Sequence, residues 1–144
     1  MFERYTASAR QAIFFAREEA QKAGSERIQT EHLLLGLLRE DASFLAPLLP
    51  LTATEAHLRS LISGQSEQRP GLPSNTDTPL SNASKVAMMR AAKESDKLGH
   101  KHIGTDHLLL GLLAEEGSFA HQFLKESGAD VKSIRKSIAE STNF

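Results

Sequence analysis

The sequence predicts an all-α protein built from two related halves. Residues 28–40 read IQTEHLLLGLLRE and residues 103–115 read IGTDHLLLGLLAE, with three of the thirteen positions changed across a separation of 75 residues. Apolar residues recur at spacings of three and four, and no alternating strand pattern interrupts them. A chain of 144 residues that repeats itself near half its length is a duplicated module. We therefore expect two four-helix repeats, about eight helices in all, related by a pseudo-twofold axis.

The repeat register sets the domain boundaries. It runs backwards without a gap, so that Thr6 falls on Ser81 and Ile28 on Ile103, and it slips by one residue only after Leu49. Residues 63–79, SGQSEQRPGLPSNTDTP, are polar, contain three prolines and two glycines, and carry no helical period. Each half alone would bury little apolar surface. We expect one domain over residues 1–144, with repeat one at 1–64, a linker at 65–79 and repeat two at 80–144.

The first two helices follow from caps and periodicity. Thr6 can cap a helix that runs through Ala23, with Gly24 at the position where a helix commonly ends. Thr30 can cap a second helix over residues 31–39, whose LLLGLL run is apolar on nearly all sides and belongs in the centre. Gly36 marks a place where another helix approaches closely.

The remaining two helices of the first half have weaker signals. Ser43 can cap a short third helix that Pro47 and Pro50 bend or end. The stretch from Thr52 to Glu55 has the spacing of a capping box and leads into a fourth helix.

The second half repeats this scheme. The same signals predict helices at residues 81–98, at 105–115 with Gly111 matching Gly36, at 118–126, and from the Asp130 cap to about residue 140. The leucines of both LLLGLL runs are expected in the core. One residue of each adjacent pair, Phe14 with Phe15 and Met88 with Met89, is expected at the surface, because neighbours on a helix point about 100° apart.

Charge and composition exclude several classes of partner. A net charge of −1 gives no basic field for nucleic acid or acidic membranes. No apolar run approaches the roughly 20 residues of a membrane helix, and residues 1–10 lack a signal core. The absence of cysteine rules out disulfides and thiolate metal sites and fits a cytoplasmic protein. We expect a cytoplasmic monomer that binds neither nucleic acid nor membranes.

Three segments carry a resemblance to a known family. The stretches MFERYTASARQAIFFAREEAQKAG, TEHLLLGLLRE and GTDHLLLGLLAEEGSFA strongly resemble the paired repeats of the Clp N-terminal domain, especially that of ClpC-type unfoldases. The resemblance implies a non-catalytic module that recognises substrates or adaptors for a Clp-family ATPase working with a peptidase. No G-x-x-x-x-G-K-[ST] phosphate loop occurs in the chain, so ATP hydrolysis by that route is expected elsewhere.

The same resemblance implies a phosphoarginine site in each repeat. It pairs the acid of the T-E/D-H motif with a hydroxyl at the start of a first helix, here Glu31 with Thr6 and Asp106 with Ser81. A carboxylate can accept a forked pair of guanidinium N–H bonds, while hydroxyls and helix N-terminal amides suit the phosphate. Asp106 is one methylene shorter than the glutamate usual in the family. The alternative is structural: the acids favour the helix dipoles and the hydroxyls are only caps.

The histidines and the function leave further alternatives. His100, His102 and His107 are close in sequence, but His32 and His107 repeat as a pair, which favours a local structural hydrogen bond over a metal site. No nucleophile and base arrangement is evident, so we expect no enzyme, metal or cofactor. The alternative to a receptor is an accessory subunit that regulates assembly of the protease core or the ATPase ring. A metal-dependent enzyme is the third possibility.

Overall fold

The computed structural model describes residues 3–65 and 69–141 of the chain. These residues contain no β-sheet, only two isolated β-bridges, and the all-α prediction is confirmed. None of the described helices is both long and apolar enough to cross a membrane. The helices in chain order are α1 (Ala7–Lys22), α2 (Thr30–Leu45), the 3₁₀ helix η1 (Ala46–Leu48), α3 (Glu55–Gln65), α4 (Asn82–Lys97), α5 (Thr105–Ala114), α6 (Phe119–Glu126) and α7 (Val131–Ser141).

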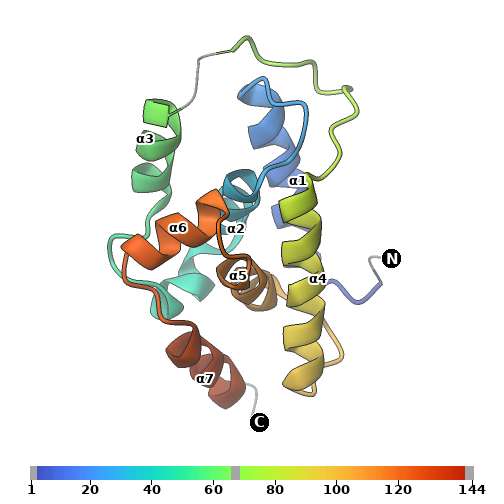
Figure 1. The fold of residues 1–144 in the computed structure, drawn as a ribbon. Coiled ribbons are helices and arrows are strands. Elements are labelled where there is room, and N and C mark those ends of the chain that lie inside the picture. The colour runs from blue at the N-terminus through green and yellow to red at the C-terminus, as the bar shows by residue number, and fades with distance from the viewer. Residues whose placement is uncertain (1–2, 66–68, 142–144) are drawn as a thin grey trace.

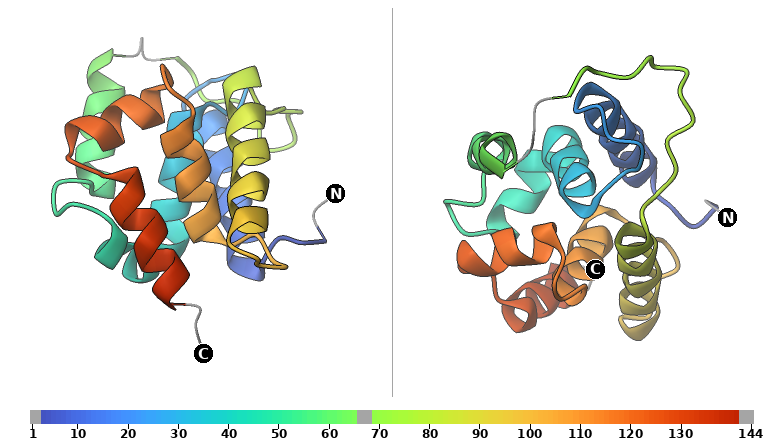
Figure 2. Two further views of the ribbon diagram at one scale, coloured as in Figure 1. Left: turned by 60° about the horizontal axis from the view of Figure 1, so that its bottom comes forward. Right: turned by 45° about the horizontal axis from the view of Figure 1, so that its top comes forward.

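The leucine-rich helices α2 and α5 occupy the centre, as predicted. Figures 1 and 2 show them between α1 and α4 on one side and α3, α6 and α7 on the other. Every residue of the two LLLGLL runs is buried. Gly36 permits the contact of α2 with α1, because an added Cβ would lie 2.1 Å from the carbonyl oxygen of Ala12. Gly111 faces Ala87 at the same 2.1 Å, so the two repeats use one packing solution.

Several predicted caps are confirmed. The side chains of Thr6, Ser81 and Ser118 each accept a hydrogen bond from the amide three residues on, at 3.0, 3.1 and 3.1 Å. The Asp130 carboxylate does the same for the amide of Ser133 at 3.2 Å. Gly24 has a φ of +70°, which suits the end of α1.

Three cap predictions in the first half are wrong. Thr30 is the first residue of α2 and not its cap, which is Gln29. The predicted third helix does not begin at Ser43: the chain continues from α2 through a kink at Asp41 (φ −137°, ψ 35°) and tightens into η1 at Pro47. For α3 the capping oxygen belongs to Thr54, which accepts from the His57 amide at 3.2 Å, and not to Thr52.

Matched ion pairs fix the last helix of each repeat. The buried Glu19 of α1 accepts hydrogen bonds from Arg39 and Arg59, and the buried Glu94 of α4 accepts them from Arg135, all at 2.8–2.9 Å. Burial acts to raise the pKa of Glu19, but the bonds and charges of the two arginines outweigh it and lower that pKa. The Arg135 hydrogen bond likewise lowers the pKa of Glu94. The sequence analysis missed this pair, although the two acids share one place in the repeat.

The described part of the linker lies along α1. The amide of Leu72 donates to the carbonyl of Gln21 at 2.8 Å, and the Gln21 side chain donates to the carbonyls of Ser74 and Thr76 at 3.3 and 3.1 Å. Residues 66–68 of the predicted linker fall outside the described residues. Figure 1 shows this segment passing from α3 over the end of α1 to α4.

Candidate functional site

Two β-bridges join the repeats crosswise and decide which predicted site residues meet. Tyr5, just before α1, pairs with Ile103, just before α5, and Ile28, just before α2, pairs with Leu80, just before α4. The Thr6 amide donates to the Ile103 carbonyl at 3.0 Å. Each candidate site is therefore built from the first helix of one repeat and the second helix of the other.

The predicted pairing within a repeat is wrong for this reason. The Ser81 amide donates to the Ile28 carbonyl at 3.0 Å, which places Ser81 beside the start of α2 and its acid, Glu31. Thr6 correspondingly lies beside the start of α5 and Asp106. Within repeat one, α1 and α2 form a hairpin of 16-residue helices, each about 24 Å long, so Thr6 and Glu31 stand at opposite ends.

The first site combines Ser81 and Glu31. Ser81 donates to Ser84 Oγ at 3.0 Å, and Ser84 donates to the Ile28 carbonyl at 2.8 Å, so a hydroxyl chain fixes the start of α4 against the start of α2. Glu31 is partly exposed, and burial raises its pKa against the opposing effect of backbone and Thr30 hydrogen bonds. The Thr30 hydroxyl accepts from the Ala120 amide at 3.3 Å, at the start of α6.

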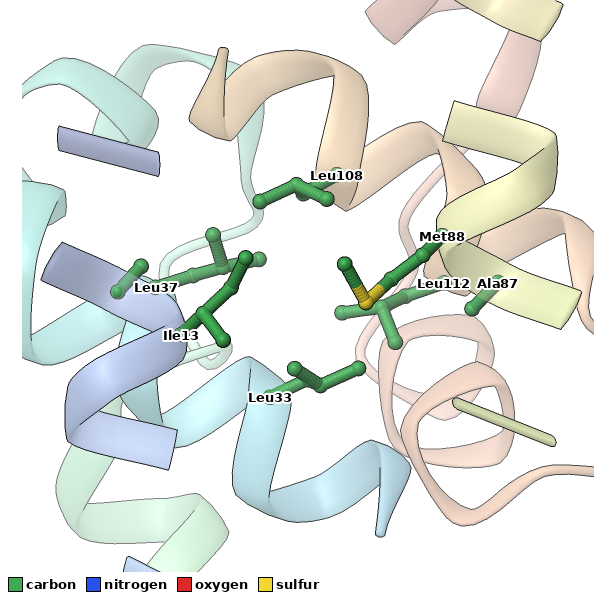
Figure 3. A pocket seen from close by; sticks show the side chains of 8 residues that line it. Ile13, Leu33, Leu37, Ala87, Met88, Leu108 and Leu112 are labelled. Atoms are coloured by element: carbon green, nitrogen blue, oxygen red, sulfur yellow. The ribbon is translucent and has the colours of Figure 1, made fainter. Parts of the chain in front are cut away.

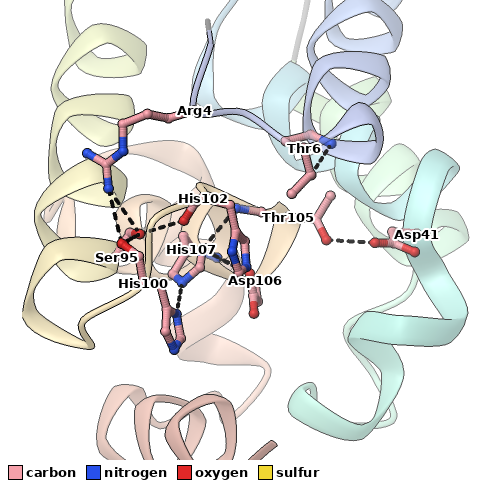
Figure 4. Close-up of polar contacts among 11 residues, drawn as sticks. Arg4, Thr6, Asp41, Ser95, His100, His102, Thr105, Asp106 and His107 are labelled. Carbon is pink, nitrogen blue, oxygen red and sulfur yellow. Dashed lines mark hydrogen bonds and ion pairs between the residues drawn. The ribbon is translucent and has the colours of Figure 1, made fainter. Parts of the chain in front are cut away.

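The second site combines Thr6 and Asp106 and differs in charge. Asp106 is only 5% exposed, and its Oδ1 accepts from the His107 amide at 2.8 Å. The Thr105 hydroxyl, which corresponds to Thr30, donates to the carboxylate of Asp41 at 2.7 Å (Figure 4). A helix N-terminus therefore faces the first site where a carboxylate faces the second.

An apolar pocket opens between α1, α2, α4 and α5. Its lining consists of four pairs of residues that are each 75 apart, which places it on the pseudo-twofold axis (Figure 3). Its empty space of about 250 Å³ includes the part that is open to solvent. The pairs are Ala12 with Ala87, Ile13 with Met88, Leu33 with Leu108, and Leu37 with Leu112.

Two exposed apolar side chains follow the pocket residues in sequence. Phe14 is 51% exposed and Met89 is 52% exposed, whereas Met88 is buried and Phe15 is covered by the Arg39 guanidinium at 4.0 Å. The prediction that one member of each pair lies at the surface is confirmed. Large apolar residues held in water at matching places on α1 and α4 are typical of a contact surface.

The paired histidines make the local hydrogen bonds that their repetition predicted. The amides of Gln29 and Gly104 donate to Nδ1 of His32 and His107, both at 2.9 Å. Burial lowers the pKa of His32 to about 4. His107 also lies 2.8 Å from His100, and with His102 these are the residues that could hold a metal ion in the described part of the chain.

Two helical hairpins packed about a dyad, with matched clefts where their helix starts meet, define a double-repeat helical domain. The chain belongs to the Clp repeat (R) N-terminal domain family, whose profile matches residues 4–127 and, in a second match, residues 80–143. The predicted resemblance is confirmed. Domains of this family are generally substrate- or adaptor-binding modules of Clp ATPases and chaperones.

Relatives with known names are much longer than this chain. The chloroplastic ClpA homolog of Brassica napus, an ATP-binding subunit of an ATP-dependent Clp protease, is 34% identical over 143 residues, which are 96% of this chain and 16% of that protein. The chaperone ClpC1 of Arabidopsis thaliana chloroplasts is 34% identical over 96% of this chain and 15% of its own length. For ClpB of Oceanobacillus iheyensis the values are 33%, 97% and 17%.

Solved structures share the fold. The N-terminal domain of ClpD from Arabidopsis thaliana has a TM-score of 0.75 at 28% identity and covers 98% of this chain and 95% of its own. The Hsp104 N-terminal domain from Candida albicans has a TM-score of 0.75 at 19% identity and covers 98% and 93%. At that lower identity only the fold is established.

Proposed function

We propose that this chain is a protein-binding module that recognises substrates or adaptors for a Clp ATPase and its peptidase. The observation that carries the proposal is the open apolar pocket on the pseudo-twofold axis, next to the exposed Phe14 and Met89. A pocket that both repeats line in matching pairs can accept an extended apolar segment. Side chains left in water beside it extend the contact beyond the pocket.

We further propose that a phosphoarginine side chain binds where Ser81 meets Glu31. Glu31 supplies the carboxylate for the guanidinium, and the first amides of α4, unsatisfied within the helix, supply donors for the phosphate beside the Ser81 hydroxyl. The start of α6 near Thr30 adds a positive helix dipole. Arginine phosphorylation would thereby mark a protein for this site.

The second site is expected to bind this ligand more weakly. Asp41 lies against Thr105, so an entering phosphate would meet a carboxylate where the first site offers a helix N-terminus. Asp106 is also buried and already accepts the His107 amide. Both effects favour the site with Glu31.

Calorimetry with free phosphoarginine tests the ligand. We expect weak but measurable binding that falls at least tenfold in Glu31→Ala and changes less in Asp106→Ala. Arginine and inorganic phosphate serve as ligand controls and should each bind far more weakly than the combined group. Equal affinity in the wild type and both variants would refute the placement of the site.

Pull-down experiments test the wider role. The chain is immobilised and offered a Clp ATPase, its peptidase and a cell extract that contains arginine-phosphorylated proteins. Capture of phosphorylated clients, reduced by Glu31→Ala, supports a receptor. Stable binding of the peptidase or the assembled ring without any client would favour the accessory subunit instead.

A further inference from the structure

Three imidazoles converge where α4 turns into α5. The ring nitrogens of His100, His102 and His107 that could serve as ligands lie within 4.8 Å of one another. His100 Nδ1 and His107 Nε2 are 2.8 Å apart, and the His102 ring is stacked on that of His100, with centroids 5.5 Å apart (Figure 4). Neutral imidazole nitrogen is a preferred ligand of Zn²⁺.

The backbone that carries two of these rings is held in place. The buried Ser95 hydroxyl lies 3.2 Å from the His100 carbonyl oxygen and 2.6 Å from that of His102. Arg4 donates to the Lys101 carbonyl at 3.0 Å. A site fixed in this way loses little conformational freedom when an ion binds.

Repeat one provides an internal comparison. The positions 75 residues before His100 and His102 are Ser25 and Arg27, and their turn has the same backbone hydrogen bond, from Ser25 to Ala20 at 2.9 Å, as that from His100 to Ser95 at 2.9 Å. The turn therefore folds without histidine at either position. Only His107 has a counterpart, His32, with a shared structural bond. Packing does not explain the two additional imidazoles.

A carboxylate is also placed to support the buried ligand. Asp106 Oδ1 lies 3.2 Å from His107 Nδ1, the nitrogen that now accepts the Gly104 amide. Coordination through Nε2 moves the His107 proton to Nδ1, where Asp106 can accept it, and the Gly104 amide then gives up its bond to that nitrogen. Ligating histidines commonly donate to a carboxylate in this way. The nearby cation Arg4 is paired with Asp96 at 2.8 Å.

The distances suit a zinc ion with modest adjustment. Zinc–nitrogen bonds of about 2.0–2.1 Å in a tetrahedral site separate two ligand nitrogens by about 3.3 Å. His100 Nδ1 and His107 Nε2 need to separate by roughly half an ångström from their present hydrogen bond. The ion would take the place of the proton that the two rings share.

We infer that this chain binds one Zn²⁺ ion through His100, His102 and His107, with Asp106 as the hydrogen-bond partner of His107 and the fourth position open to water or to a partner's side chain. The ion would tie the α4–α5 turn to the first turn of α5. Zinc binding here is independent of recognition at Glu31 and at the apolar pocket.

Calorimetry with zinc chloride and metal-stripped protein tests the inference. We expect one ion per chain. The double variant His100→Ser with His102→Arg takes the residues that repeat one already uses in this turn, so it should fold and lose at least tenfold in affinity. His57→Ala, an exposed histidine outside the cluster, should bind as the wild type does. An affinity within twofold of the wild type in the double variant would show adventitious binding and overturn the site.

Nitrogen-15 spectra of the imidazoles give a second measurement. Without zinc, His107 should carry its proton on Nε2, and on saturation it should carry it on Nδ1. Asp106→Asn should weaken binding by roughly tenfold, as loss of an outer hydrogen bond typically does. An unchanged His107 tautomer at full zinc occupancy would overturn its role as a ligand.

Discussion

The close contact of α1 and α2 at Gly36 makes Gly36→Ala a demanding test of the packing. An alanine Cβ would lie 2.1 Å from the Ala12 carbonyl oxygen and 2.9 Å from the Ala16 amide nitrogen, both backbone atoms that cannot rotate away. Overpacking of this kind costs about 3 kcal/mol at the upper end of its usual range. Replacing a glycine inside a helix returns about 1 kcal/mol of helix propensity. The expected net loss is about 2 kcal/mol of unfolding free energy.

Urea denaturation followed by circular dichroism measures this loss. The chain supplies two comparisons: Gly111→Ala should cost about as much, since its Cβ would lie 2.1 Å from the Ala87 carbonyl oxygen. Gly64→Ala near the end of α3 meets nothing within 4 Å and should be neutral or stabilising by up to about 1 kcal/mol. Similar effects of all three substitutions would refute the close approach of the helices and the matched packing of the two repeats.

Three further outcomes are expected. Leu35→Ala should cost about 2–5 kcal/mol, as for a truncated buried leucine, while Leu51→Ala at 97% exposure should change stability by less than about 0.5 kcal/mol; equal effects in urea denaturation would contradict a central α2. Burial lowers the pKa of His32 from its ordinary 6.5 to about 4, so the unfolded chain binds the extra proton between these values and stability falls as the pH drops through that window. The loss should reach about 3 kcal/mol and be absent in His32→Asn; parallel pH curves for the two proteins would contradict it. Changing Phe14 and Met89 together to serine should reduce capture of a reduced, unfolded test protein without lowering the melting temperature; unchanged capture would argue against the pocket as the recognition surface.

The candidate sites show where reasoning from sequence reached and where it stopped. Thr6, Ser81, Glu31 and Asp106 were all identified from the repeat register and the resemblance, and each lies at a helix start. Their pairing was assigned within repeats and is wrong, because an offset of 75 residues cannot tell which repeat supplies the neighbour. Asp41 gave no signal, since its effect depends on a kink that brings it to Thr105.

The sequence by itself determined the all-α class, the duplication, most helix starts and the burial of the leucine runs. These properties depend on neighbours within one or two turns, so caps and 3.6-residue periodicity report them. Only the tertiary structure decided that the helix starts meet across the repeats, that the apolar pocket lies on their axis and that three histidines converge. Those contacts join residues that the chain keeps far apart, or depend on how a turn folds, and they form only when both hairpins bury their leucines against each other.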